Sequence, residues 1–558
     1  MNYPTTRATA AAPDIHGENA TTLSLFAATD AAAPALTYFD QTLSYAALDQ
    51  LSDRLAVWLH AHGVRRGDRV ATLLQNTPQF VIVALATWKL AAIIVPLNPM
   101  YRVPELKRLF ADCQPSALIC HDDQWAAALE ASAGVVDPKC LLWASPHELQ
   151  SRGDARVLQA PVAESAPAAT SLAAVLAAVL ADELPDGTMR DPAAARPAAD
   201  DVAVLLYTSG TTGLPKGAML THRSLVFNAR NCVAHFGLTP DSRIFGIAPL
   251  FHVTGFVVQM VAAITASASL VLTYRFQPAV ALDAFLEHRP TFVIGAITVF
   301  IALMNRPDTT RAHFDSLEHI FSGGAPIAPA VVQAFEQRFG RAIRSSYGMT
   351  ELSAPSHLAP NEGLIPVDPA SGALSIGRLL PGIDAIVIDD TGAPLGPRGI
   401  GELLVRGPNV MAGYWGKPIE TGQALRAGWM HTGDVGFQDE DGWFYLIDRK
   451  KDMISASGFK VWPREVEDVL YAFAGVREAG VVGAPDAYRG ETVVAFVSAV
   501  DGVTLDLVAL NAHCRERLAA YKCPAAIHIV AELPKTETGK ITRAMLAQQL
   551  RSGGAVKV

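Results

Sequence analysis

Residues Tyr207 to Gly217 have the sequence YTSGTTGLPKG, and this stretch decides how the rest of the chain is interpreted. It follows an apolar run at Val202–Leu206 and precedes a helical pattern for which Thr221 is a suitable N-cap. Glycine lets backbone amides approach an anion closely, hydroxyls donate further hydrogen bonds, and the Lys216 ammonium adds a positive charge. The stretch therefore predicts a loop, between a strand and a helix, that holds a polyphosphate.

This loop differs from the Walker A loop of P-loop kinases. The pattern GxxxxGK[ST] would require glycine where Pro215 stands and a hydroxyl where Gly217 stands. A flexible Ser/Thr/Gly linker would have a similar composition, but the position between a strand and a helix favours a phosphate loop.

Further motifs follow the loop, and their order is informative. They are Pro249-Leu-Phe-His252, Ser322-Gly-Gly-Ala-Pro326, Tyr347-Gly-Met-Thr-Glu351, Gly413-Tyr-Trp415, Thr432-Gly-Asp434, Asp448-Arg-Lys-Lys-Asp452, Gly458-Phe-Lys460 and Pro534-Lys-Thr-Glu-Thr-Gly-Lys540. Together with the loop, they resemble the motifs of the acyl-adenylate-forming (ANL) superfamily, which includes acyl-CoA synthetases, peptide-synthetase adenylation domains and beetle luciferases. The resemblance extends from about Tyr45 to the end of the chain.

The sequence predicts an α/β fold. Helical patterns such as Tyr45–His62 alternate with short apolar runs such as Arg69–Leu74 and Ala92–Pro96, an order that implies mostly parallel strands. At 558 residues the chain is too long for one ordinary core. We therefore expect a large multi-sheet N-terminal domain with parallel α/β layers and a small mobile α+β C-terminal domain, the latter with two helical patterns that include Pro463–Ala472.

The expected domain limits follow changes in composition. Residues 1–22 form a mobile N-terminal tail, residues 23–448 an ATP- and acyl-binding adenylation domain, and residues 449–558 the small domain. Within the large domain, residues 144–201 are rich in Ala and Pro and are expected to form an irregular excursion.

Composition excludes several classes of function. Forty-five Lys and Arg against 54 Asp and Glu leave no basic stripe, so nucleic acid is not expected as a partner. Six cysteines without a CxxC pair suggest neither a zinc site nor a disulfide framework, which fits a reducing cytoplasm. The apolar stretches Val81–Leu97 and Phe256–Tyr274 are interrupted by polar residues, so we expect buried elements and no integral membrane segment. Both a monomer and a homodimer stay open.

The resemblance implies an ATP site. Glu351 would ligate Mg2+ together with phosphate oxygens, and Thr350 would contact the α-phosphate. The ring of Tyr347 would stack on adenine, while Asp434, supported by Arg449, would accept hydrogen bonds from the ribose hydroxyls. The other ATP-binding residues that it implies are Thr208, Ser209, Gly210, Thr211, Thr212, Gly213, Lys216, Gly324, Ala325, Pro326 and Gly348.

The resemblance also implies a catalytic lysine on the small domain. Lys540 would join Thr350 and Glu351 as a catalytic residue, its ammonium bridging the carboxylate and the ribose or phosphate oxygens. Lys451 would be the hinge between an adenylating and a thioester-forming orientation. Coenzyme A would bind along Gly458, Phe459 and Lys460.

The acid is expected to be apolar. Domains that activate amino acids usually have an aspartate where this chain has His252, so a substrate ammonium would lack its counter-ion. Phe251, His252, Gly255 and Met349 would line the acyl pocket, with few charges around them. Phrases such as Asn98-Pro-Met-Tyr-Arg102 look most like bacterial medium- and long-chain fatty acyl-CoA synthetases.

The sequence thus predicts an AMP-forming acyl-CoA synthetase that uses ATP, Mg2+ and coenzyme A and acts on a medium- or long-chain fatty acid. An aryl (benzoate- or cinnamate-type) CoA ligase and an enzyme that loads a carrier protein stay as alternatives. A binding protein that has lost the chemistry is a third, although Lys216, Glu351, Asp434, Arg449 and Lys540 are all present.

Overall fold

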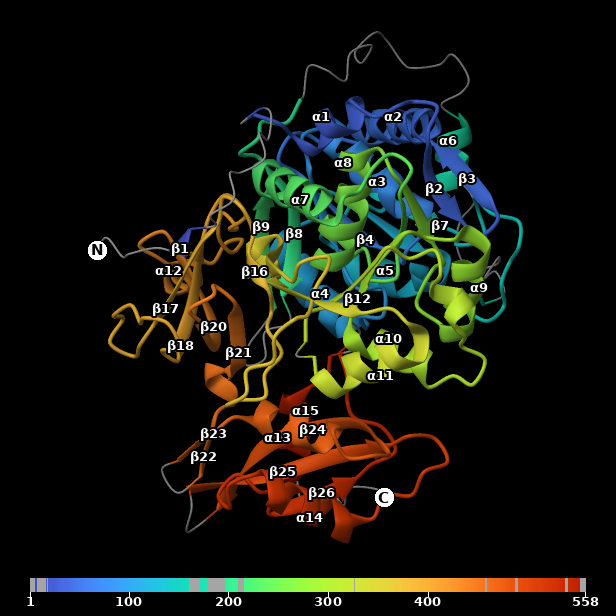
Figure 1. Cartoon of the computed structure of the whole chain (residues 1–558). Helices are drawn as coiled ribbons and strands as arrows, with labels where there is room; N and C mark the ends of the chain where they lie inside the picture. Colours follow the sequence, from blue (N-terminus) through green and yellow to red (C-terminus); the bar gives the residue numbers. More distant parts are fainter. Residues whose placement is uncertain are drawn as a thin grey trace.

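The computed structural model describes residues 6–7, 17, 19–159, 171–178, 196–208, 215–325, 327–456, 459–486, 490–536 and 540–551. Figure 1 shows a large body, built around three sheets, above a small one that contains β22 to β26 and α13 to α15. The predicted α/β fold with a multi-sheet large part and a small α+β part is confirmed.

The first sheet of the large body positions the phosphate loop. Its order is β7-β6-β4-β5-β8-β9, and all neighbours are parallel except β8 and β9. Thr208 at the end of β8 lies opposite Lys216 at the start of β9, so the two ends of the predicted loop are side by side. The strands are β4 (Arg69–Leu73), β5 (Ile93–Pro96), β6 (Ala117–His121), β7 (Leu141–Ala144), β8 (Val202–Thr208) and β9 (Lys216–Thr221).

The second sheet contains the strands that lead to the other motifs. Its order is β16-β15-β14-β13-β12-β10-β11-β2-β3, and the run from β14 to β2 is parallel throughout. Ligands of such sheets bind beyond the carboxyl ends of the strands. The strands are β2 (Pro34–Tyr38), β3 (Gln41–Ser44), β10 (Arg243–Phe245), β11 (Ser269–Leu272), β12 (Phe292–Gly295), β13 (His319–Gly323), β14 (Ile343–Met349), β15 (Ala354–Leu358) and β16 (Arg378–Leu379).

The third sheet is antiparallel, which the sequence did not predict. Its order is β1-β17-β18-β20-β19, with β21 paired to β20. Asp434 on β20 lies directly across from Arg449 on β21, so this sheet brings two predicted site residues together. The strands are β1 (Thr6–Arg7), β17 (Asp384–Ile388), β18 (Gly401–Arg406), β19 (Leu425–Arg426), β20 (Trp429–Gln438) and β21 (Phe444–Arg449).

Helices cover the large body. Thr221 is the N-cap of α7, because its side chain accepts a hydrogen bond from the Ser224 amide, as predicted. The helices are α1 (Thr22–Ala27), α2 (Tyr45–Ala61), α3 (Pro78–Lys89), α4 (Val103–Cys113), α5 (Trp125–Ser132), α6 (Leu172–Ala178), α7 (His222–Phe236), α8 (Ala262–Ala266), α9 (Pro278–His288), α10 (Ile297–Met304), α11 (Pro329–Phe339) and α12 (Pro418–Ala424), with a π-helix, η5, at Thr254–Val261 and short 3-10 turns η1 (Asp122–Gln124), η2 (Pro138–Cys140), η6 (Arg311–Phe314), η7 (Thr350–Leu352) and η8 (Lys450–Asp452).

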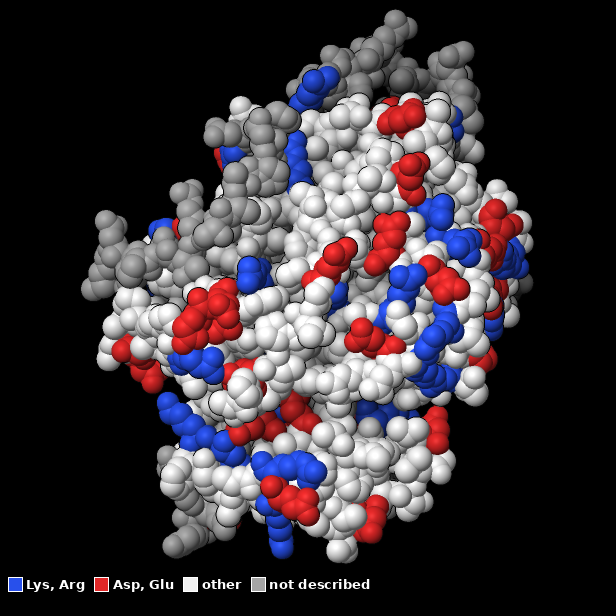
Figure 2. Space-filling model, in the orientation of Figure 1, with Lys and Arg blue, Asp and Glu red and all other residues white. Residues whose placement is uncertain are grey.

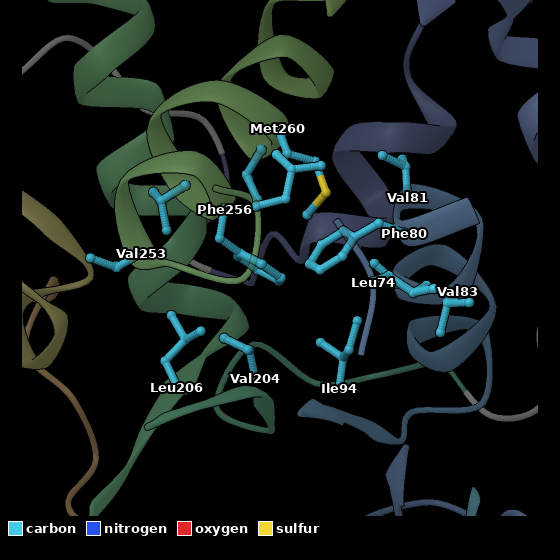
Figure 3. Close-up of a cluster of buried hydrophobic side chains, with 14 of the residues drawn as sticks. Leu74, Phe80, Val81, Val83, Ile94, Val204, Leu206, Val253, Phe256 and Met260 are labelled. Carbon is cyan, nitrogen blue, oxygen red and sulfur yellow. The ribbon is translucent and has the colours of Figure 1, made fainter. Parts of the chain in front are cut away.

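The core lies between α3, η5 and the first sheet. Figure 3 shows Phe80 and Phe256 facing one another above Ile94 and Val204. The rings of Phe80 and Phe256 are 6.2 Å apart in an edge-to-face arrangement, which favours aromatic pairs. Every residue of α3 is buried. The apolar stretches at Val81–Leu97 and Phe256–Tyr274 are therefore buried elements, as predicted.

The small body has one more helix than the sequence indicated. The predicted helix at Pro463–Ala472 is α13 (Pro463–Tyr471), and the described residues also include α14 (Leu507–Arg517) and α15 (Arg543–Arg551). Helix α15 has a weak apolar pattern in the sequence. In the part of it whose burial is described, Leu546 is the one fully buried side chain, so few apolar residues mark a buried face. The strands are β22 (Ile454–Ala456), β23 (Phe459–Val461), β24 (Val476–Asp486), β25 (Gly490–Ala499) and β26 (Ala526–Ile529).

Two segments predicted to lack regular structure contain some. In residues 1–22, Thr6–Arg7 pairs with β17, and α1 begins at Thr22. In residues 144–201, α6 packs near α2, where Arg54 donates a hydrogen bond to the Leu176 carbonyl. Both observations concern only the described parts of these segments.

In the described parts of the chain, no helix combines the length and apolarity needed to cross a bilayer. On the face shown in Figure 2, Lys and Arg are interspersed with Asp and Glu.

Candidate active site

The candidate site begins at the carboxyl ends of β13 and β14. Gly324 and Ala325 follow β13, while Tyr347, Gly348 and Met349 end β14 and lead into the turn η7. At Gly348 an added Cβ would lie 2.0 Å from the Ala354 carbonyl oxygen, so only glycine lets β14 pass this close to β15. The parallel sheet thus places two of the predicted ATP-binding motifs next to one another.

Lys540 reaches this place from the small body. A Cβ built on Gly324 would lie 3.0 Å from Cε and 3.4 Å from Nζ of Lys540. Two hydrogen bonds hold the lysine: the Thr536 amide donates to the Lys540 carbonyl at 2.7 Å, and the Lys540 amide donates to the Thr536 hydroxyl at 3.1 Å. The structure therefore brings the predicted catalytic lysine to the turn after β13.

Asp434 is the centre of a polar cluster. The Tyr347 hydroxyl donates to Oδ2 of Asp434 at 2.7 Å, and Nε of Arg449 lies 3.4 Å from Oδ1. Burial raises the pKa of Asp434, and the Arg449 guanidinium opposes this shift. Tyr347, Asp434 and Arg449, all predicted to contact the nucleoside, are therefore neighbours.

The charge of Lys540 depends on this cluster. Desolvation and the positive charge of Arg449 lower the pKa of Lys540 to about 8, while Asp434 and Glu351 favour the ammonium. The lysine is thus poised near neutral pH, where an added anion would stabilise its charged form.

The turn that holds Glu351 is strained and well supported. Ser353 and Ala354 have φ values of +52° and +91°, which are unusual for residues other than glycine. The Asn228 side chain donates to the carbonyls of Leu352 and Ser353 at 3.0 and 2.7 Å, which fixes the turn. Glu351 itself is buried, against the usual exposure of glutamate.

Glu351 and Lys216 contact different parts of the Tyr414 side chain. The Tyr414 hydroxyl donates to Oε1 of Glu351 at 2.8 Å, and Nζ of Lys216 lies 4.5 Å from the centre of the Tyr414 ring. The hydroxyl of Thr208 donates to the Lys216 carbonyl at 3.4 Å, which ties the two ends of the phosphate loop.

The residues present fit a magnesium ion. Within the described residues, Oε2 of Glu351 has no hydrogen-bond donor, while Oε1 is occupied by Tyr414. Mg2+ prefers hard oxygen ligands and usually takes one or two carboxylates together with phosphate oxygens. Glu351, in the turn η7 that packs against β9, supplies one such carboxylate.

The predicted acyl-pocket residues divide into two groups. Phe251, His252 and Met349 are half-buried, and desolvation together with the nearby Lys540 charge lowers the pKa of His252 to about 3. The imidazole is thus neutral. Gly255 is fully covered, and a Cβ there would lie 2.1 Å from the Pro249 carbonyl oxygen, so packing already explains this glycine.

The predicted hinge and coenzyme A residues lie along the start of the small body. Lys451 is in the turn η8, between β21 and β22. On β23, Nζ of Lys460 is 4.0 Å from Asp390 of the large body, and the Phe459 ring stacks on Tyr521 at 4.6 Å. The predicted site residues Ser209, Gly210, Thr211, Thr212, Gly213, Pro326 and Gly458 lie outside the described residues.

Sequence reasoning missed an ion network beside the hinge. Arg543 contacts Asp448 at 2.6 Å, Glu467 at 2.7 Å and Asp452 at 3.3 Å. Arg543 stands three residues after Lys540, so the network anchors the segment that presents the lysine. Asp448 belonged to a quoted motif, but nothing in the sequence linked it to Arg543.

Comparison with known proteins defines the family. A family model described as AMP-binding enzyme matches residues 24–415, and one described as AMP-binding enzyme C-terminal domain matches residues 465–540. The chain belongs to the AMP-binding enzyme family, which confirms the resemblance drawn from the motifs.

Individual relatives match nearly the whole chain. A long-chain-fatty-acid–CoA ligase of Bacillus subtilis (strain 168) is 35% identical over 537 residues, covering 92% of this chain and 91% of the relative. A feruloyl-CoA synthase of an Amycolatopsis species is 36% identical over 516 residues, covering 92% and 94%. The crystal structure of ATP-bound MatB from Rhodopseudomonas palustris superimposes with a TM-score of 0.83 at 29% identity, covering 96% of this chain and 100% of that one. The predicted enzyme class, an acid–thiol ligase, is confirmed.

Proposed function

We propose that the protein is an AMP-forming acyl-CoA synthetase whose acid is a medium- or long-chain fatty acid and whose co-substrates are ATP and coenzyme A. One observation supports the adenylation step above the others. Lys540, from the small body, lies against Gly324 and shares its electrostatic surroundings with Asp434 and Glu351.

In the first half-reaction, a carboxylate oxygen attacks the α-phosphorus of ATP. The bond to the oxygen that bridges to the β-phosphate breaks, and pyrophosphate leaves with the electron pair. The Lys540 ammonium, against Gly324, offsets the charge of the two approaching anions and orients them. Asp434, which accepts a hydrogen bond from Tyr347 and lies beside Arg449, would hold the ribose. Bound Mg2+, held by Glu351, would neutralise charge on the phosphate oxygens.

In the second half-reaction, the sulfur of coenzyme A attacks the acyl carbonyl carbon. The bond to the AMP oxygen breaks, AMP leaves with the electron pair, and the thiol proton passes to solvent. Phe459 and Lys460 are proposed to line the coenzyme A path after the small body turns about Lys451. We place the reaction in the cytoplasm, since all six cysteines are free thiols.

The identity of the acid rests on two arguments. Phe251 and Met349, the half-buried residues predicted to line the pocket with His252, are apolar, and the imidazole itself is neutral because burial and the Lys540 charge lower its pKa to about 3. The Bacillus subtilis relative is named for long-chain fatty acids. A feruloyl-CoA synthase is equally similar, so an aryl acid is the second candidate.

A panel of acids tests this proposal. Acetate, fatty acids of increasing length, benzoate, coumarate and ferulate are each incubated with ATP, Mg2+ and coenzyme A, and the thioester and pyrophosphate are measured. We expect the highest kcat/KM with a medium- or long-chain fatty acid. A preference for ferulate or benzoate would establish the aryl alternative, and pyrophosphate release without thioester would indicate a carrier-loading enzyme.

A further inference from the structure

The motif Gly413-Tyr414-Trp415 has no role in the scheme above, yet its backbone is hydrogen-bonded to the strand that begins with Lys216. The Met219 amide donates to the Gly413 carbonyl at 2.9 Å, and the Trp415 amide donates to the Gly217 carbonyl at 2.8 Å. The segment 411–415 therefore runs as an added strand beside β9, the strand that begins with Lys216.

The same segment is joined to the turn that holds Glu351. The Met411 amide donates to the Glu351 carbonyl at 2.9 Å. Gly413 has a φ of +139°, and a Cβ there would lie 2.8 Å from Thr421, whose hydroxyl accepts a hydrogen bond from the Tyr414 amide at 2.9 Å. The backbone of Tyr414 is thus fixed relative to both Lys216 and Glu351.

The Tyr414 side chain contacts both charged groups. Its hydroxyl is bonded to Glu351 at 2.8 Å, and its ring face lies 4.5 Å from the Lys216 ammonium, within the range of a cation–π contact. The phenol is the donor in the hydrogen bond to Glu351, because a carboxylate oxygen can only accept.

A direct ion pair between Lys216 and Glu351 would use the carboxylate that the metal needs and the cation that the phosphates need. The phenol instead donates to one oxygen of Glu351 and offers its ring face to Lys216, so each charge has a neutral partner and stays available to a ligand.

We propose that Tyr414 is a positioning residue that serves as a shared neutral partner of Lys216 and Glu351 and directs both at one Mg2+–polyphosphate group. This inference rests on the proposed function, because it takes Mg2+ and ATP as the ligands of the site.

The experiment measures ATP binding to the full chain by calorimetry, once with Mg2+ and once with EDTA, in the absence of acid and coenzyme A. Tyr414→Phe removes the hydrogen bond to Glu351 and keeps the ring. We expect it to weaken binding of Mg2+–ATP about tenfold, as loss of a hydrogen bond to a charged group does, and to leave binding of metal-free ATP unchanged. Tyr414→Leu also removes the ring, so it weakens binding of both forms.

Two controls separate positioning from general damage. Tyr445→Phe removes another tyrosine-to-carboxylate hydrogen bond, to Asp439 at 3.1 Å, outside the site, and is expected to bind both forms of ATP as the wild type does. Glu351→Gln should lose the same Mg2+-dependent part of the ATP affinity. Adding Tyr414→Phe to this variant should cause little further loss, because both changes act on one interaction.

Wild-type affinity of Tyr414→Phe for Mg2+–ATP would overturn the proposal. So would an equal loss for both forms of ATP accompanied by a lower thermal midpoint, since that pattern indicates a structural role. If the wild type forms no thioester with any acid, the proposed function fails, but the binding measurement is unaffected and the two failures are distinguished.

Discussion

Lys540 fits against Gly324 because Gly324 has no side chain. Its Cε and Nζ atoms lie 3.0 and 3.4 Å from the position that a Cβ atom would take at Gly324, and the glycine has a φ of +81°. The contact joins the large body to the small one at the Lys540 ammonium, the group that we propose to be catalytic.

Gly324→Ala should therefore push the end of the Lys540 side chain away from the turn by a few tenths of an ångström. We expect acyl-AMP formation to fall about tenfold, because small misplacements of a positioned group lower the rate. Conversion of supplied acyl-AMP and coenzyme A to thioester should be retained. Pyrophosphate exchange measures the first step and thioester formation the second.

The control is Gly363→Ala. Gly363 has a φ of +80° and no atom within 4 Å of its added Cβ, so this variant has the same backbone strain without the clash. If Gly363→Ala loses as much exchange as Gly324→Ala, backbone strain and not the lysine contact is responsible.

The pH dependence of adenylation should follow Lys540. Its pKa in the protein without substrate is lowered to about 8, so the ammonium is lost as the pH rises through that value. We expect kcat/KM for ATP to fall about tenfold per pH unit above this point, because kcat/KM reports the free enzyme. Lys540→Arg stays charged and should lack this alkaline limb, whatever its absolute rate. The same limb in both proteins would assign it to another group.

The proposed hinge can be tested at Lys451. Proline there fixes φ near −65°, and a hinge residue must absorb a change in backbone dihedral angles. We expect Lys451→Pro to retain acyl-AMP formation, because Lys540 already lies against Gly324, and to lose transfer to coenzyme A. Both half-reactions are measured on one folded preparation, and wild-type rates for both would exclude a required pivot at Lys451.

The Arg543 network should dominate the stability of the small body. Arg543→Met leaves Asp448 and Glu467 without their buried counter-ion, a change that typically costs about 3–5 kcal/mol. Thermal unfolding measures this loss. Lys450→Met breaks an exposed pair with Asp390 on the same connection and should shift the midpoint far less. Equal shifts would mean that the network contributes no more than a surface pair.

His252 should select the acid and leave ATP use unchanged. We expect His252→Ala to change kcat/KM between a fatty acid and an aryl acid by about tenfold, the scale of a modest change in a hydrophobic pocket. The KM for ATP should stay near that of the wild type. An unchanged order of kcat/KM across the panel of acids would show that His252 has a purely structural role.

Much of the fold could be predicted because local patterns matched the final elements. The helix expected at Tyr45–His62 is α2, and the strands expected at Arg69–Leu74 and Ala92–Pro96 are β4 and β5. The antiparallel sheet from β17 to β21 was missed. Its β20–β21 pair is a local hairpin across 439–443, but β18 and β20 pair across the segment 407–428, which contains α12, and no local pattern marks that pairing.

The site was predictable where a motif is contiguous. The adjacency of Tyr347 and Asp434 was implied by the family, but their hydrogen bond depends on contact between two different sheets. Tyr414 was visible as a motif residue without a role, since its partners Glu351 and Lys216 meet it only in the folded chain. Arg543 had no signal, because its partners lie on three other elements.

The antiparallel pair of β20 and β21 has a mechanical consequence. Asp434 and Arg449 face one another across it, and two residues after Arg449 the chain reaches Lys451. If the small body swings at that point, the force acts on the last residue pair of the β20–β21 ladder, where we propose that the ribose binds. Nucleotide binding and the orientation of the small body would then be coupled, so that AMP would leave in the same step in which the small body swings back.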